Sequence, residues 1–249
     1  MGTREQLYQT ITLIFVVLLL DFLERRQPGH AVDRQWDLPL NILALLTVIV
    51  AGEMWKVVIL TGFNAFNLRS VVFIPSLQEL PGEVRIFLGV VLADFCLYWV
   101  HRFMHRNALL WRTHVFHHSI KELWWLAGSR TSVTHLLLFA LPQILLGYYI
   151  LGLSQHEAGV AFSIGVVVNV WIHTNLWINL GPLEWILITP NYHRVHHGAR
   201  GLASKNLGFV FTVWDRMFGT YTNPESVGKG FALGFVPTGK RLLRMIVGV

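Results

Sequence analysis

Five long apolar segments constrain the fold of this chain more than any other feature. They cover residues 7–23, 38–61, 83–100, 134–153 and 158–177. A helix needs about 20 apolar residues to cross the hydrocarbon core of a bilayer, so each segment is close to the length of a membrane span. We therefore expect an all-α integral membrane protein with about four to five transmembrane or re-entrant helices, folded as a single domain over residues 1–249. Pro142 and Gly147 interrupt the fourth segment, which pairs with the fifth as a hairpin.

The composition supports a membrane location and limits the partners. The chain is 53% hydrophobic and only 14% charged, which is unusual for a soluble domain. Its net charge of +6 is compatible with nucleic acid, but basic loops that face anionic lipid explain the charge more simply. We therefore expect no nucleic-acid partner. The single cysteine, Cys96, excludes an intrachain disulfide and a cysteine-based metal site.

Basic residues indicate how the segments are oriented. Arg25, Arg26 and Arg34 follow the first segment, and further arginines and lysines occur in residues 101–133 and 179–249. Short loops rich in arginine and lysine stay in the cytoplasm. We therefore expect residues 101–133 and 179–249 to form the cytoplasmic part of a multi-pass protein, with the N-terminus on the opposite side.

Histidines are concentrated in two stretches at the predicted cytoplasmic ends of these segments. Eight of the twelve lie in residues 94–118 and 191–198, at helical spacings of three and four that would place each set of imidazoles on one side of a helix. Neutral imidazole is a common ligand for iron, zinc, copper and nickel, and eight rings plus one or two more ligands could serve two ions. The eight are His101, His105, His114, His117, His118, His193, His196 and His197.

Histidines outside the two stretches carry less information. A single histidine on an apolar face, such as His30 or His156, is more often structural than a metal ligand. That interpretation does not suit the clusters, because burying many unpaired polar rings near a membrane costs free energy. His173 lies alone at the end of the fifth segment, where it could join the cluster or lie at the membrane interface.

Asp94 and Tyr98 extend the stripe of His101 and His105 along one helical face. We expect Asp94 to be buried within the third apolar segment. Its carboxylate could be a structural hydrogen-bond partner, or it could accept the N–H of a metal-binding histidine, and we favour the second role.

In order along the chain, these motifs resemble the histidine boxes of the fatty acid hydroxylase and sterol desaturase superfamily. The matching motifs are H-R-F-M-H at 101–105, H-V-F-H-H-S at 114–119 and H-R-V-H-H-G at 193–198. The resemblance also covers Asp94, Tyr98 and Trp99 and the sequence W-D-R-M-F-G-T at 214–220, and it runs from about residue 81 to about residue 237. Members of this superfamily are integral-membrane di-iron enzymes.

The resemblance implies a set of site residues and cofactors. It implies two iron ions held by nine histidines, namely the eight above and His173. It also implies a catalytic site that includes Arg130 and Asn175 beside Asp94 and Tyr98. Dioxygen would be the co-substrate. Zinc fits the same ligands but has no redox chemistry, so it is the resemblance that favours iron.

Three further runs look most like alkylglycerol monooxygenase and its bacterial relatives. They are W-I-H-T at 171–174, N-L-G-P-L-E at 179–184 and Thr189-Pro190. That subfamily hydroxylates the ether-linked carbon of glyceryl ethers and uses a reduced pterin. Many superfamily members have Arg-x-His-Pro-x-Glu where this chain has R-T-S-V-T-H at 130–135, and others have a further histidine where it has Trp177. The role of His135 and the identity of a tenth ligand are therefore open.

The leading functional hypothesis is O2-dependent hydroxylation of a C–H bond in a membrane lipid, whether a fatty acyl chain, a sterol or a glyceryl ether. A desaturase of the same superfamily is the first alternative, and a metal-binding membrane protein without catalysis is the second. No haem or flavin motif is visible, so we expect electrons from a reduced pterin or a separate redox protein. The sequence does not indicate the oligomeric state.

Overall fold

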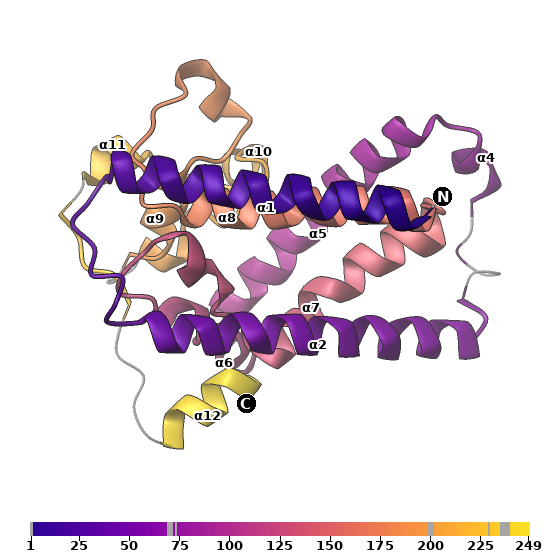
Figure 1. Ribbon diagram of the computed structural model, residues 1–249, viewed down its shortest axis with the longest axis horizontal. Coiled ribbons are helices and arrows are strands. Elements are labelled where there is room, and N and C mark those ends of the chain that lie inside the picture. The colour runs from indigo at the N-terminus through magenta and orange to yellow at the C-terminus, as the bar shows by residue number, and fades with distance from the viewer. Residues whose placement is uncertain (1, 69–71, 73, 199–201, 229, 235–239) are drawn as a thin grey trace.

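The computed structural model describes residues 2–68, 72, 74–198, 202–228, 230–234 and 240–249. Residue 237, near the end of the stretch that resembles the superfamily, lies outside these residues. Five long helices form the body of the molecule (Figure 1): α1 (Gly2–Arg26), α2 (Leu38–Ala65), α5 (Gly82–Arg106), α7 (Val133–Ile144) and α8 (Gln155–His173). The shorter elements are α4 (Pro75–Gln78), α6 (Ala108–His114), η1 (His117–Ser119), η2 (Trp125–Ser129), η3 (Leu145–Ile150), η4 (Gly181–Trp185), α9 (Pro190–His196), η5 (Leu202–Ser204), α10 (Val213–Met217), α11 (Pro224–Val227) and α12 (Lys240–Val247).

The all-α prediction is confirmed. Within the part of the chain that the structure describes, two isolated β-bridges are the only extended pairing. Four stretches are long and apolar enough to cross a membrane, and they lie at 7–26, 38–65, 82–106 and 133–150. They correspond to the first four predicted segments. The fourth runs through Pro142 as a helix and widens into a π-helical turn, η3, at Leu145, in keeping with a backbone N–H that proline cannot supply.

The fifth predicted segment differs from the helix that forms there. Helix α8 begins after Ser154, whose side chain forms a capping box with Glu157, and it ends at His173. Residues 174–177 of the predicted segment therefore lie outside the helix. Thr174 takes an extended conformation and donates its hydroxyl to the carbonyl of Trp171, which closes the last turn. Helix α8 is also not among the four apolar stretches above.

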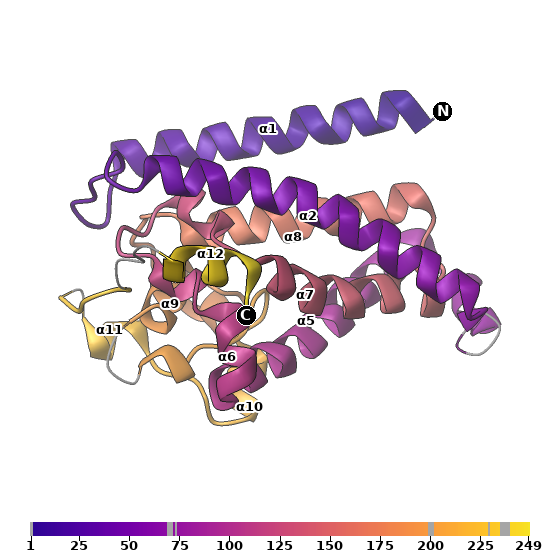
Figure 2. The ribbon, with the colours of Figure 1, turned by 90° about the horizontal axis from the view of Figure 1, so that it is seen from below.

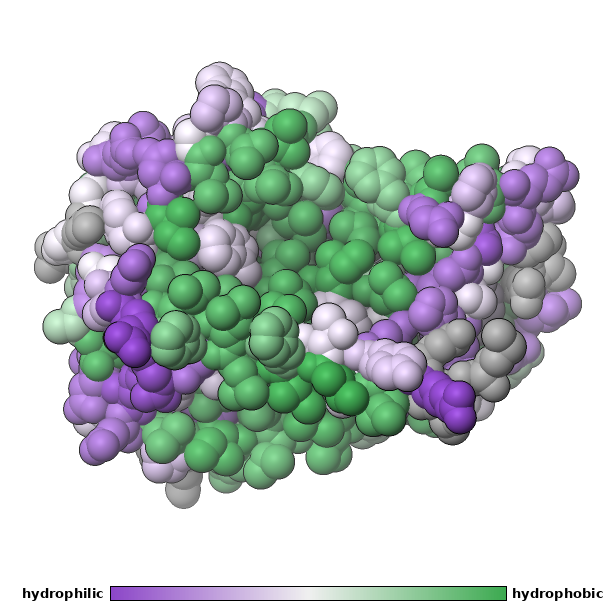
Figure 3. All heavy atoms as spheres, turned by 45° about the horizontal axis from the view of Figure 1, so that its top comes forward, coloured by the Kyte–Doolittle hydropathy of each residue, from purple (hydrophilic) through white to green (hydrophobic). Residues whose placement is uncertain are grey.

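The long helices run alternately toward one end of the molecule and the other (Figures 1 and 2), and in Figure 1 α5 and α7 are inclined to α1 and α2. Helix α1 packs on α8, α2 packs on α7, and α5 contacts both α7 and α8. Figure 3 shows a broad apolar surface over the middle of the molecule, with polar residues gathered toward its two ends. A soluble monomer rarely exposes so large an apolar patch, so this surface fits contact with lipid.

The two ends of the bundle differ in character. At the end that holds the N-terminus, Arg85 pairs with Glu157 at 2.6 Å and donates to the carbonyl of Gly152, which ties α5 to α8. The opposite end gathers α6, α9, α10 and α11 over the last turns of α5 and α8 (Figure 1). The histidine-rich segments all belong to this second end.

Candidate metal centre

Nine histidines converge in two groups at the capped end of the bundle. Group I contains five residues, and group II contains four. In each group, one ring nitrogen from every member lies within 4.8 Å of the corresponding nitrogens of the others. Group I is His101, His105, His114, His118 and His196, and group II is His117, His173, His193 and His197. All nine histidines expected from the sequence are therefore brought together.

The two H-x-x-H-H boxes are divided between the groups. In the box at 114–118, the outer pair belongs to group I and His117 to group II. In the box at 193–197, the outer pair belongs to group II and His196 to group I. The division follows the same pattern in both boxes although their backbones differ: α6 ends at His114, before the 3₁₀ turn that contains His117 and His118, whereas α9 runs without a break from Pro190 to His196.

Backbone carbonyls orient four of the nine rings. The Nδ1 atom of each lies 2.7–3.1 Å from a carbonyl oxygen: His101 from Leu207, His117 from Arg130, His173 from Asn169, and His196 from Lys205. A carbonyl can only accept, so Nδ1 must carry the proton in these four contacts. Neutral imidazole has one N–H, and Nε2 is therefore left with a free lone pair.

These tautomers make the nitrogen contacts inside the groups informative. His117 and His173 both use their proton at Nδ1, yet their Nε2 atoms lie 3.4 Å apart. No proton is available to join the two nitrogens, so two lone pairs face each other. In group I, Nε2 of His196 is buried and has no hydrogen-bond partner among the described residues. Both arrangements suit nitrogens that share a cation.

Burial keeps the rings in the form that binds metals. It lowers the pKa of the six candidate ligands in the loops and in α6 and α9 well below 6.5, and neighbouring imidazoles lower it further: His114, His117, His118, His193, His196 and His197. These rings are therefore neutral at pH 7. Only His105 among the nine is partly exposed.

Close packing fixes His173 within group II. Gly128, in η2, lies directly against its ring, and a Cβ at that position would come within 2.7 Å of the imidazole. Glycine is therefore required for this approach. His173, which the sequence left between a ligand and an interfacial residue, is 1% exposed and lies 3.1 Å from His193 through their Nε2 atoms.

Asp94 has a different role from the one we expected. Its carboxylate accepts the backbone N–H of Val210 and Phe211 and the indole N–H of Trp214, at 2.8–3.0 Å, and no histidine contacts it among the described residues. His101, which lies on the same helical stripe, donates to the carbonyl of Leu207. Asp94 thus holds the segment at 207–214 against α5, and it acts on the histidines only through that segment.

The W-D-R-M-F-G-T motif also forms hydrogen bonds to the segment at 207–214, through Asp215. Asp215 accepts the backbone N–H of Leu207 and Gly208, at 2.8 and 2.7 Å, and also accepts the hydroxyl of Tyr192. Because the Leu207 carbonyl accepts from His101, the motif sets the position of one candidate ligand without touching it.

Asp94→Asn should weaken this segment. The amide presents one accepting oxygen, so at least one buried N–H donor loses its partner, which costs about 1–3 kcal/mol. We expect lower stability and weaker metal retention together, measured by thermal unfolding and metal content. Loss of turnover at wild-type stability and metal content would instead favour a direct role in the reaction.

Tyr98 lies beside the histidines without joining them. Its hydroxyl lies 2.9 Å from the hydroxyl of Thr220 and accepts from Arg102 at 2.6 Å, and its ring stacks on Phe218. These contacts connect α5 to the C-terminal motif.

Arg130 is a buried structural cation. It is fully buried, pairs with Asp37 at 2.6 Å and donates Nε to Asn41. Its own carbonyl accepts from His117. The side chain therefore links the start of α2 to the position of a candidate ligand. Asp37 and Asn41 were not predicted as site residues, because their importance follows only from this long-range contact.

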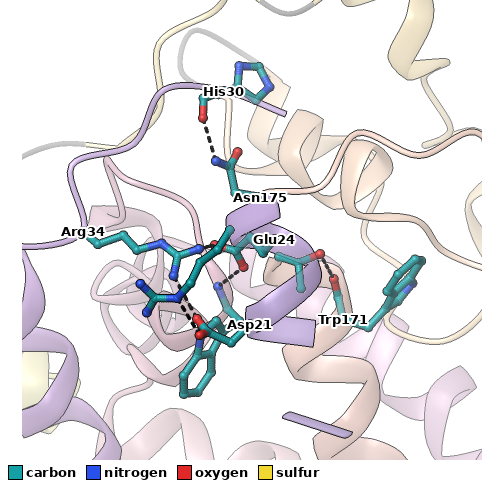
Figure 4. Close-up of polar contacts among 9 residues, drawn as sticks. Asp21, Glu24, His30, Arg34, Trp171 and Asn175 are labelled. Carbon is teal, nitrogen blue, oxygen red and sulfur yellow. Dashed lines mark hydrogen bonds and ion pairs between the residues drawn. The ribbon is translucent and has the colours of Figure 1, made fainter. Parts of the chain in front are cut away.

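Asn175 belongs to a polar network at the end of α1 (Figure 4). Its side-chain amide N–H donates to the carbonyl of His30 at 2.8 Å, and its backbone carbonyl accepts from the backbone N–H of Gly29. In the same network Arg34 bridges Asp21 and the fully buried Glu24. Asn175 thus anchors the chain just after His173 to the loop between α1 and α2.

Comparison with known proteins identifies the family. The model of the family described as fatty acid hydroxylase matches residues 86–220, more than half of the chain. The chain belongs to the fatty acid hydroxylase family. The matched range contains all nine histidines of groups I and II, and also Asp94, Tyr98, Arg130 and Asn175.

Several curated proteins are similar to this member of the fatty acid hydroxylase family. Alkylglycerol monooxygenase from Danio rerio is 40% identical over 56% of this chain and 30% of its own length. The human alkylglycerol monooxygenase is 31% identical over 85% of this chain and 46% of its own. Ornithine lipid hydroxylase OlsE from Rhizobium tropici is 37% identical over 59% of this chain and 44% of its own. The chain thus spans about a third to a half of these relatives. No solved structure matches it.

Proposed function

We propose that the chain is an O2-dependent monooxygenase that holds two iron ions and hydroxylates a C–H bond of a membrane lipid. The observation that carries the proposal is the pair of histidine groups, in one of which the unprotonated Nε2 atoms of His117 and His173 face each other without a proton between them. Membership of a family whose similar proteins are named monooxygenases and hydroxylases supports the reaction class.

We assign one ion to each group. His101, His105, His114, His118 and His196 would hold the first, and His117, His173, His193 and His197 the second. Iron bound there supplies the redox chemistry with dioxygen, which zinc cannot. The residues around the groups orient and bury the ligand rings. Asp94, Tyr98, Arg130 and Asn175 support this arrangement from outside it. Electrons would come from a reduced pterin or a redox protein.

We propose that the lipid reaches the centre from the side of His105. This ring is the partly exposed member of group I, and Trp111 packs on it and on His118, with ring centroids 5.2 and 5.1 Å apart. Phe103 and Leu109, which flank it in sequence, are 53% and 68% exposed. An acyl or alkyl chain in the bilayer could therefore approach along apolar side chains. By the distribution of basic residues, this end of the bundle faces the cytoplasm.

A test of the proposal uses the full chain in lipid nanodiscs after anaerobic loading with ferrous iron. Glyceryl ethers, ornithine lipids, sterols and sphingoid lipids would each be supplied with labelled dioxygen and a reductant. We expect one substrate class to gain one labelled oxygen atom, with two irons per chain. His193→Ala should abolish the product, whereas His156→Ala, at the far end of the molecule, should not. An unlabelled lipid profile in every class, with iron bound, would refute the oxygenase proposal.

The same experiment decides between hydroxylation and desaturation. Both reactions begin with the removal of a hydrogen from an unactivated C–H bond, so the histidine groups suit either. A product that has lost two hydrogens and gained no labelled oxygen would identify a desaturase.

A further inference from the structure

His135 lies beside the histidine groups without belonging to either. It occupies the first turn of α7, where Ser132 caps the helix by accepting its backbone N–H. The side chain is 5% exposed, and its ring packs on Phe139 with centroids 4.3 Å apart. Its Nδ1 atom lies 3.0 Å from Nδ1 of His114. The question is what this contact does for His114.

The chemistry of His114 requires an acceptor at that place. Its Nε2 atom faces group I, 2.9 Å from Nε2 of His101 and 3.1 Å from Nε2 of His118. A nitrogen that binds a metal ion carries no proton, and neutral imidazole has one N–H. The proton of a metal-bound His114 must therefore lie on Nδ1, and in a buried site that N–H needs a partner.

Four other histidines meet the same requirement with a backbone carbonyl, as described above. Among the described residues, the only hydrogen-bond partner of His114 Nδ1 is the ring of His135. We propose that His135 is a positioning residue that accepts the Nδ1–H of His114 and thereby aims His114 Nε2 at the ion of group I. This inference rests on the metal binding proposed above.

The imidazole of His135 differs from a carbonyl in one respect. A carbonyl oxygen always accepts, whereas Nδ1 of His135 accepts only when its own proton lies on Nε2. An asparagine side chain carries an accepting oxygen close to the place of a histidine Nδ1. Glutamine places its amide one bond farther out, and leucine offers no acceptor. Comparing these three substitutions therefore distinguishes hydrogen-bond acceptance at the position of Nδ1 from packing alone.

The test measures the affinity of the full chain in detergent for ferrous iron and for cobalt(II), by competition with a chelator. We expect H135L to lower the affinity for the ion of group I by about 10–100-fold. This is the usual effect of removing the hydrogen-bond partner of a ligand histidine. H135N should stay within a few-fold of the wild type, and H135Q should resemble H135L. Phe139→Leu is the matched control, because it alters packing on the same ring without removing a hydrogen bond.

A double-mutant cycle asks whether His135 acts through His114. In a chain that already carries His114→Ala, adding H135L should cause no further loss of affinity. Circular dichroism of the metal-free variants checks that each is folded. If H135L does not fold, the difference in metal affinity between H135N and H135Q still tests the role of His135. Wild-type affinity in H135L, no rescue by H135N, or additive losses in the cycle would each overturn the role of His135. A wild-type chain that binds no metal would overturn the proposed function itself.

Discussion

A chain carrying His196→Ala should keep one iron and lose the other, and it should form no detectable product. The reason is the division of the boxes: His196 belongs to group I with His101, His105, His114 and His118, although its neighbours in the sequence belong to group II. His193→Ala should give the reverse, with the ion of group II lost. The measurement is iron per chain together with the absorption spectrum of the cobalt(II)-substituted protein.

Pairs of substitutions make the same prediction stricter. His101→Ala and His196→Ala should remove the same ion, so the double variant should still hold one. His193→Ala and His196→Ala, only three residues apart, should together leave none. If each box instead held an ion of its own, H193A/H196A would keep one iron, and our assignment of the groups would be wrong.

Arg130→Met should destabilise the protein by about 3–5 kcal/mol, because it leaves the carboxylate of Asp37 buried without its partner. Removing both charges, in R130M/D37L, should recover much of that loss, since well-packed apolar residues often replace a buried ion pair at little cost. Denaturant unfolding in detergent would measure both. Arg25→Met breaks a pair with Asp21 in which the arginine side chain is 62% exposed, and it should cost no more than about 1 kcal/mol.

The Arg130 variants also test what this residue does for the centre. Because its carbonyl accepts from His117, we expect R130M to lose metal in parallel with stability. Wild-type stability and metal content with a specific loss of turnover would contradict a structural role. Such a result would return Arg130 to the catalytic site that the resemblance to the family implies.

The histidine set was predictable because its information is local. Spacings of three and four along the chain, at the ends of apolar segments, were enough to single out eight of the nine rings that converge, and the family resemblance added His173. The division between two groups was not predictable from spacing. It depends on which rings of the other elements meet each box, and therefore on how α5, α8 and α9 pack together in the tertiary structure.

The supporting residues were harder to predict because their partners lie far away in the chain. Asp94 binds backbone N–H groups that come more than a hundred residues later, and those groups leave no trace in the identity of Val210 or Phe211. Arg130 likewise depends on Asp37, which is separated from it in the chain by α2, α5, α6 and shorter elements. A polar residue in an apolar segment signals that a partner exists, but only the tertiary structure identifies that partner.

The exchange of histidines between the two groups has a consequence for the chain as a whole. Each bound ion would join α5 or α8 to loops from both boxes, so the pair would act as crosslinks that close long loops, from the first box at 101–105 to the last at 193–197. Crosslinks of this kind restrict the unfolded chain, and metal binding then contributes directly to folding. Iron would therefore be part of the connectivity of the histidine-rich end of the bundle, and a chain deprived of it during synthesis would lack the closure of that end as well as its chemistry.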